Sequence, residues 1–277
     1  MPRRRPCWSL SKHRIKLVVA YDGTDFCGWA PQSGQRTVHG TLTEGIRQIS
    51  GEENEILGAS RTDSGAHAKG QVCHFDTAAG VPPERWPRIL NKILPPDLKV
   101  VSATVAPPDF HSRFWADRRW YRYRFLIGHP DPQRSRYTHG VHRALNVESM
   151  QRAAHDFVGT HNFLAFSQQL EGEVNTERTL FSVEVKRVRD EIALDVVGTA
   201  FVRGMMRRIA GSLLEIGRGR RPEDDIPRLL RQTSKANIDY PVVLPACGLT
   251  LMKVVYGRHP SDNRRFLPTE ISPEDEE

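Results

Sequence analysis

Stretches with a two-residue apolar period alternate with stretches of helical period along nearly the whole chain. In residues 15–21, Ile15, Leu17, Val19 and Tyr21 fall on one side of an extended segment, which is the pattern of a half-buried strand. Strands separated by helices, with a hairpin in the second half, predict two α+β units. The same patterns predict further strands at 71–77, 98–106, 119–127, 180–188, 191–199 and 249–256, and helices near 38–49, 85–94, 147–157 and 202–216.

The proline pair Pro107-Pro108 is the best candidate for a boundary between the two units, because neither residue continues a strand or helix easily. The first residues are basic and poor in acids, as organelle transit segments are, but they lack the apolar core of a secretory signal. We expect a basic arm there, with a transit segment as the alternative. The predicted parts are a basic arm at 1–14, an N-terminal α/β domain at 15–107, a C-terminal α/β domain at 108–267 and an acidic tail at 268–277.

Charge is distributed unevenly over the sequence. The formal net charge is +7, and the tail at 268–277 holds five of the 33 acids and no Lys or Arg. Residues 1–267 therefore carry +12, from 40 basic residues and the remaining 28 acids. A basic body favours a polyanionic partner such as a nucleic acid. The alternative is that this charge serves solubility alone.

Several classes of protein are excluded by missing motifs. The four cysteines, at positions 7, 27, 73 and 247, form no CxxC pair, so we expect reduced thiols and a cytoplasmic protein. HExxH, GxSxG and GxxxxGK[ST] are absent, which argues against zinc hydrolases, serine hydrolases and P-loop NTPases. No apolar run approaches the roughly 18 residues that a membrane span needs.

The segment 59–67 places an arginine and an aspartate two positions apart among small polar residues. Arg61 and Asp63 lie in ASRTDSGAH, between two apolar segments. A turn in which Asp63 bonds a nearby backbone N–H is the structural interpretation. A functional Asp63 needs a cationic partner and a cleft that excludes water.

The predicted helix at 202–216 offers such a partner. Arg203 and Arg207 stand four positions apart, beside the apolar stripe, and Gly204 and Gly211 flank Arg207. Each glycine costs a helix about 1 kcal/mol relative to alanine, so we expect a compensating feature such as the close approach of another backbone. The alternative is two solvated arginines on an ordinary helix.

Basic and aromatic residues alternate along the predicted strand at 119–127. One side carries Tyr121 and the other Arg122 and Arg124, a pattern that suits base stacking and phosphate contact. A core strand with an exposed basic face is an equal alternative. The candidates for contact with an RNA backbone are Arg119, Arg122, Arg124, Arg203 and Arg208.

Taken together, these segments resemble one family. ASRTDSGAHAKGQVCHFDT at 59–77 is similar to the GRTDAGVHAxGQVxHF block of the TruA-type tRNA pseudouridine synthases. Four more blocks match that family in order, so the resemblance spans about residues 15–256. They are YDGTDFCGWAPQ at 21–32, DFHSRFWADRRWYRYRF at 109–125, FVRGMMRRIAGSLLEIGRG at 201–219 and CGLTL at 247–251.

The resemblance implies roles for particular residues. Asp63 falls on the family's catalytic aspartate and Arg207 on the arginine that pairs with it. Tyr121 falls on the active-site tyrosine, Arg61 on the loop arginine associated with base flipping, and Leu249 on the apolar residue that lines the pocket.

The chain also departs from the family's pattern, without losing a catalytic side chain. The differences are Ser60 in place of Gly, Ser64-Gly65-Ala66 in place of Ala-Gly-Val, Arg203-Gly204 in place of a more aromatic or polar pair, and DYPVVLP at 239–245 in place of an Ala/Pro-rich stretch. The last difference leaves open whether that loop makes the family's usual contacts.

By resemblance, the expected activity is isomerisation of uridine to pseudouridine at positions 38, 39 and 40 in the anticodon stem-loop of tRNA. The resemblance further implies two α/β subdomains that share a continuous mixed, largely antiparallel sheet, a central basic cleft, a homodimer, and no metal or cofactor. A carboxylate could act as nucleophile at C1′ or as base at C2′, and the sequence leaves both routes open.

Two other functions compete with this one. A non-catalytic RNA-binding module could use the same basic surface, but a carboxylate among phosphates would repel its ligand. A glycoside-type hydrolase would need two cooperating carboxylates. Asp76 is the nearest further carboxylate in the sequence, and nothing in the pattern ties it to Asp63.

Overall fold

The computed structural model describes residues 12–129, 131–168, 175–234 and 238–257. Most of the predicted basic arm and all of the predicted acidic tail lie outside these residues. The elements are β1 His13–Tyr21, α1 Val38–Ser50, β2 Leu57–Gly58, β3 His67–Thr77, η1 Pro83–Arg85, α2 Trp86–Ile93, β4 Leu98–Ala106, β5 Ala116–Ile127, β6 His139–Val141, α3 Val147–His155, β7 Gly159–Asn162, η2 Leu164–Phe166, β8 Glu177–Val188, β9 Glu191–Gly198, α4 Met205–Gly217, α5 Asp225–Leu230, η3 Ala246–Gly248 and β10 Leu249–Tyr256.

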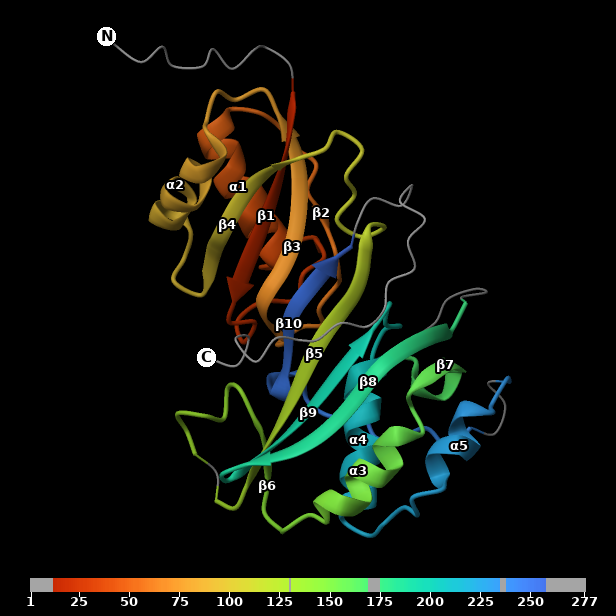
Figure 1. The fold of residues 1–277 in the computed structure, drawn as a ribbon. Coiled ribbons are helices and arrows are strands. Elements are labelled where there is room, and N and C mark those ends of the chain that lie inside the picture. The colour runs from red at the N-terminus through yellow and green to blue at the C-terminus, as the bar shows by residue number, and fades with distance from the viewer. Residues whose placement is uncertain (1–11, 130, 169–174, 235–237, 258–277) are drawn as a thin grey trace.

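One mixed sheet runs through both halves of the molecule, in the order β4-β1-β3-β10-β5-β9-β8-β7, with β2 beside β3 and β6 beside β5. The last strand, β10, lies between β3 and β5 (Figure 1), parallel to β3 and antiparallel to β5. Apart from β3–β10 and β5–β6, the pairs are antiparallel. The predicted continuous, largely antiparallel sheet is confirmed. The sheet contains strands from both sides of Pro107-Pro108, so the boundary between two domains at this proline pair stays a prediction.

Helices cover the sheet in two groups. Figure 1 shows α1 and α2 beside the N-terminal strands and α3, α4 and α5 beside the C-terminal strands. Side chains such as Leu42 and Trp86 are fully buried in the first group, as are Ile209 and Leu213 in the second. The two groups belong to one continuous cluster of buried apolar residues. None of the described helices is long and apolar enough to cross a membrane.

The long periodic segments form as predicted, with corrections at their ends. Strand β1 begins at His13, inside the predicted arm. Helix α4 begins at Met205 after Gly204, whose φ of 76° is left-handed, so Arg203 lies outside the helix. Gly217 is its last helical residue, and an added Cβ there would lie 2.7 Å from the sulfur of Met150. The strands β2, β6 and β7 and the helix α5 were not predicted.

Candidate active site around Asp63 and Arg207

The loop 59–67 connects β2 to β3 and packs closely against the segment that follows β1. An added Cβ at Gly23 would lie 1.9 Å from the carbonyl oxygen of Ala66, and one at Gly28, whose φ is +80°, would lie 2.6 Å from that of Thr62. The Trp29 N–H donates to the Thr62 carbonyl at 3.1 Å. The two glycines therefore permit a contact that any side chain would block.

Neutral hydrogen bonds hold the backbone of this loop. The fully buried Gln71 donates from Nε2 to the Ser60 carbonyl at 2.6 Å, and its Oε1 accepts from the Ser60 N–H at 3.3 Å. The Thr62 hydroxyl shares a 2.8 Å hydrogen bond with the hydroxyl of Tyr21. Since buried polar groups are costly without partners, these contacts define the loop's conformation.

Arg119 also holds the loop. It does not lie at the surface, where a contact with an RNA backbone would require it. Its side chain is buried, and its Nη2 atom donates to the carbonyls of Ala59 at 3.0 Å and Arg113 at 2.9 Å. Its Nη1 atom donates to the carbonyl of Thr199. Burial lowers the pKa of this guanidinium. Carbonyl oxygens occupy the donors of Arg119, and its contact with an RNA phosphate stays a prediction.

Asp63 and Arg207 form the ion pair that the resemblance implies. The Nη1 atom of Arg207 lies 3.1 Å from Oδ2 of Asp63, with side-chain exposures of 21% and 26%. The Nε atom of Arg207 donates to the Leu244 carbonyl at 2.6 Å. A turn does form at Asp63, but its backbone carbonyl accepts from the Ala66 N–H, while the carboxylate points toward α4. The pair is partly exposed, so the site is open to a ligand.

Tyr121 lies beside the same loop. Its hydroxyl shares a 2.6 Å hydrogen bond with the Ser60 hydroxyl, and its ring meets that of Phe201 edge to face at 4.8 Å. Burial raises the pKa of Tyr121, and the charge of Asp63 acts in the same direction. The phenol is therefore protonated at neutral pH.

The other two predicted site residues differ in exposure. Leu249 is buried as the first residue of β10, where it pairs with Tyr123 of β5. Arg61 is exposed, and within the described ranges no hydrogen bond or ion pair engages its guanidinium. Arg61 is thus an exposed cation in the same loop as Asp63.

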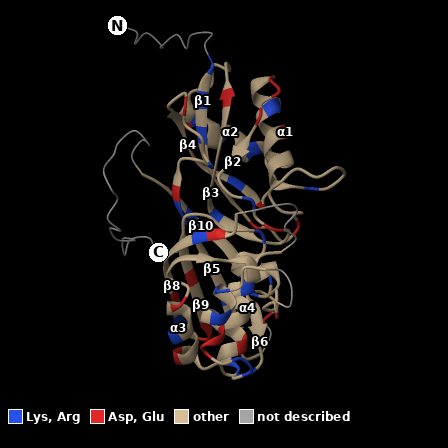
Figure 2. Ribbon diagram, turned by 90° about the vertical axis from the view of Figure 1, so that its right-hand side faces the viewer, with Lys and Arg blue, Asp and Glu red and all other residues tan. Residues whose placement is uncertain are grey.

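The remaining candidates for RNA contact are mostly engaged within the protein. Arg122 pairs with Asp195 at 2.8 Å and Arg124 with Glu191 at 2.6 Å, both across to β9. Arg208 donates to the Pro241 carbonyl at 2.5 Å and stands over the Tyr240 ring. Arg203 is exposed. Figure 2 shows Lys and Arg spread over both halves of the ribbon, and the predicted central basic cleft stays a prediction.

The unusual segment 239–245 docks on α4. An added Cβ at Gly211 would lie 1.9 Å from the Val242 carbonyl oxygen, which confirms the close backbone approach that this glycine predicted. The Tyr123 hydroxyl donates to the Pro245 carbonyl at 2.8 Å. This segment therefore fixes the carbonyl of Leu244, which in turn orients Arg207.

Sequence reasoning missed the residues that hold the loop, namely Gln71, Tyr21, Ser60 and the carbonyl-binding role of Arg119. The only signal for Gln71 was its place in the block that resembles the family. Asp76, the second carboxylate considered for a hydrolase, pairs with Arg14 at 2.6 Å near the other end of β3. Among the described residues, no three His, Cys, Asp or Glu side chains gather as metal ligands would.

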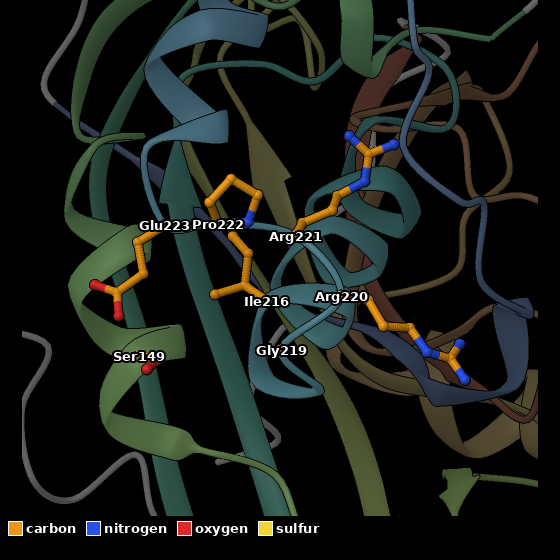
Figure 3. Close-up of a pocket in the computed structure, with 7 residues that line it drawn as sticks. All are labelled: Ser149, Ile216, Gly219, Arg220, Arg221, Pro222 and Glu223. Atoms are coloured by element: carbon orange, nitrogen blue, oxygen red, sulfur yellow. The ribbon is translucent and has the colours of Figure 1, made fainter.

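A shallow hollow of about 480 Å³ lies at the end of α4 opposite Arg207 (Figure 3), between Ser149 and the turn at 219–223. Its charged side chains are already paired, Glu223 with Arg152 and Arg220 with Glu215. It is therefore a weaker candidate site than the Asp63 loop.

The model of the tRNA pseudouridine synthase family matches residues 17–115 and 153–257. A tRNA pseudouridine synthase A of Halalkalibacterium halodurans is 42% identical over 80% of this chain and 85% of its own. One of Brevibacillus brevis is 36% identical over 88% and 99%. Among solved structures, a Cbf5–Nop10–Gar1 complex matches 72% of this chain and 45% of its own at 11% identity, with a TM-score of 0.32. That score is too low to support an argument.

Proposed function

The chain belongs to the tRNA pseudouridine synthase family and isomerises uridine to pseudouridine in tRNA, and we propose that it acts at positions 38, 39 and 40 of the anticodon stem-loop. We further propose a cytoplasmic homodimer in which Asp63 is the catalytic carboxylate. The ion pair between Asp63 and Arg207 carries this proposal, because it presents one oriented carboxylate at a partly open site.

The reaction requires that the bond from C1′ to N1 breaks, that the uracil turns, and that C1′ bonds to C5, whose proton leaves. Asp63 can attack C1′ as a nucleophile or remove a proton from C2′, and it can steady positive charge that develops on the ribose. Arg207 holds one carboxylate oxygen, which leaves the other oxygen, Oδ1, for the ribose. Both routes use the same geometry.

Tyr121 can serve the base. Its ring lies at the Asp63 loop, where a flipped uracil could stack on it. Because burial raises the pKa of Tyr121, its hydroxyl is protonated and can accept the C5 proton only by passing on its own. Ser60, at 2.6 Å, can take up that proton as it releases its own hydroxyl proton to solvent. The exposed Arg61 can occupy the position that the flipped base leaves.

Release of tritium from C5-labelled uridine in tRNA tests this function, and sequencing of the product locates the modified positions. The Asp63→Asn variant keeps the side chain's shape but loses its nucleophile and base, so turnover is lost while tRNA affinity is nearly kept. Asp76→Asn is the matched control, since Asp76 pairs with Arg14, and it keeps its activity.

A chain that binds tRNA but releases no tritium would be the RNA-binding module considered as the alternative. If Asp63→Asn kept turnover within about tenfold of wild type, a barrier change of only about 1.4 kcal/mol, the assignment of Asp63 would be wrong. Sedimentation of the full chain tests the homodimer.

A further inference from the structure

Phe114 is the most exposed large apolar side chain among the described residues. It is 76% exposed and lies in the loop 110–115 that leads into β5. Its inner face rests on the ring of His111, with the ring centroids 4.2 Å apart and the planes tilted by 33°. An aromatic side chain that is supported from below and open above is shaped to stack on another ring.

The loop that carries Phe114 is tightly held. The Nδ1 atom of His111 accepts the N–H groups of Arg113 and Phe114, each at 3.2 Å. Ser112 is fully buried and donates to the Leu57 carbonyl at 2.6 Å, while its own carbonyl accepts from the Tyr256 hydroxyl at 2.6 Å. The ring is therefore preorganised in solvent, which lowers the entropy that a ligand must offset.

Cations without carboxylate partners lie near the loop that carries this ring. Arg113 is exposed. Burial lowers the pKa of Arg119 and of Arg178, and the charge of Arg113, which lies near both, acts in the same direction. No ion pair joins any of the three to a described carboxylate. The Nε atom of Arg178 is buried and has no hydrogen-bond acceptor. This surface combines a free aromatic face with the guanidinium groups of Arg113 and Arg178, which no described carboxylate neutralises, as RNA-binding surfaces do.

Arg119 connects this surface to the loop that carries Asp63. One atom, Nη2 of Arg119, donates to the carbonyls of both Arg113 and Ala59, and Ala59 is four residues from Asp63. Four residues span at most about 14 Å, so Phe114 and the Asp63 site lie within reach of nearby nucleotides of one tRNA. Because Phe114 and Asp63 lie in different loops, we assign Phe114 a flanking nucleotide and not the target.

We propose that Phe114 stacks on an unpaired nucleobase of the tRNA that flanks the target uridine, with the adjoining phosphate held by Arg113 and Arg178. The inference rests on the proposed function, since it names a second contact for the same substrate. A second copy of this chain fits the surface less well, because a symmetric contact would bring the same guanidinium groups together.

Kinetics of tritium release by Phe114 variants test the stacking. Phe114→Ala raises KM for tRNA by about 5- to 100-fold, the usual range for loss of one stacked base, while the single-turnover rate at saturating tRNA is unchanged. Phe114→Trp keeps the KM of wild type. Phe114→Leu is apolar but has no ring, and it behaves like Phe114→Ala. Val188→Ala removes another exposed apolar side chain, at the far end of β8, and serves as the neutral control.

Arg113 and Arg178 are tested by the salt dependence of tRNA binding. Arg113→Gln and Arg178→Gln each flatten the log–log slope by about 0.7 to 0.9, and Arg113→Lys preserves it. An unchanged slope in both Gln variants would show that Arg113 and Arg178 do not contact a phosphate.

Three results would overturn the stacking contact: an unchanged KM for Phe114→Ala, a Phe114→Leu variant that equals wild type, or a Phe114→Ala variant that sediments as a smaller species than wild type. The last would identify the surface as a contact between copies. A wild-type chain that releases no tritium would instead refute the proposed function, so the two failures are distinguishable.

Discussion

The Asp63 loop and the outer face of β5 are both rich in charge in the sequence, but the structure holds them in opposite ways. Hydrogen bonds without a carboxylate hold the loop, from Gln71 to Ser60, between Tyr21 and Thr62, and from Arg119 to the Ala59 carbonyl. The outer face of β5 carries Arg122 and Arg124, and both form ion pairs with β9. Arg122 pairs with Asp195 and Arg124 with Glu191. In the loop, these partners leave Arg61 free for a ligand. On β5, the neighbouring strand has already neutralised the cations.

This difference shows that a count of arginines does not locate a binding surface. The strand that lies beside a cation decides whether its charge is available, and strand order comes from the whole chain. Substitutions in the Asp63 loop and on the outer face of β5 should therefore have different effects on turnover, stability and salt dependence.

Among these variants the largest fall in turnover is expected from Arg207→Ala, which removes the ion pair of the Asp63 carboxylate. A hydrogen bond to a charged group contributes about 1.5–3 kcal/mol, so turnover should fall by about 10- to 150-fold. Arg207→Lys should recover part of it. Because both partners are partly exposed, the free energy of unfolding should fall by only about 1–2 kcal/mol. The exposed Arg203→Ala is the control for both assays. Equal turnover in Arg207→Ala would show that the pair is not used.

Next in size is Gln71→Ala, which breaks the neutral framework. It leaves the part-buried N–H and C=O of Ser60 without their Gln71 partner, at up to about 1–3 kcal/mol for each group left unsatisfied. We expect a loss of about 2 kcal/mol in urea unfolding and a fall in kcat larger than the rise in KM. Gln71→Glu places a charge in this framework and should be no better. The exposed Gln48→Ala is the control, and a Gln71→Ala variant as stable as this control would contradict the bracing role.

Mild acid should destabilise the fold through the buried His74 of β3 before it protonates the carboxylates of the ion pairs. Burial, with help from Arg14, lowers the pKa of His74 to about 4, while an unfolded histidine titrates near 6.5. As the pH falls through this window, the unfolded chain takes up a proton that the folded chain refuses. From pH 7.5 to 5, His74 alone should therefore cost about 2 kcal/mol of unfolding free energy.

The carboxylates of the ion pairs behave differently. Arg124 and Arg134 hold the pKa of Glu191 below its usual value against the opposing effect of burial, so this contribution is lost only at pH values below the ordinary pKa of a glutamate. Urea unfolding of wild type and His74→Asn at both pH values measures the histidine part. Identical pH dependence in the two proteins would contradict it.

The smallest effects belong to Arg122→Gln and Arg124→Gln. Each pair is partly exposed and should contribute about 1 kcal/mol to the free energy of unfolding, decreasing with added salt. Because β9 already neutralises both cations, the salt dependence of tRNA binding should keep its slope. A slope that flattened by about 0.7–0.9 for each substitution would show that tRNA displaces the carboxylates and would break the comparison.

How well the sequence predicted the fold depended on element length. Strands β4 and β10 match their predicted bounds, 98–106 and 249–256, because each contains several apolar–polar repeats. The strands β2, β6 and β7 have two to four residues, and so short a segment contains too little of a period to detect. Strand order could not be predicted, since it depends on pairings between distant segments.

The candidate site shows the same division. The pairing of Asp63 with Arg207 followed from resemblance, because each lies in a recognisable block. The role of Arg119 did not, because its partners are backbone carbonyls of residues 59, 113 and 199. A carbonyl has the same chemistry in every residue, so no pattern of side chains reveals which arginine will bind it.

The position of β10 has a consequence for biosynthesis. The strand that joins the two halves of the sheet is the last one in the chain, and its parallel partner, β3, is made about 180 residues earlier. During translation one edge of β3 therefore stays unpaired until β10 is made. An unpaired strand edge is a site for wrong pairing and aggregation. Contacts between such distant segments also slow folding. A chain that stops before Leu249 lacks the strand that joins β3 to β5. The ribosome must therefore release almost the whole protein before the sheet behind the catalytic loop is complete.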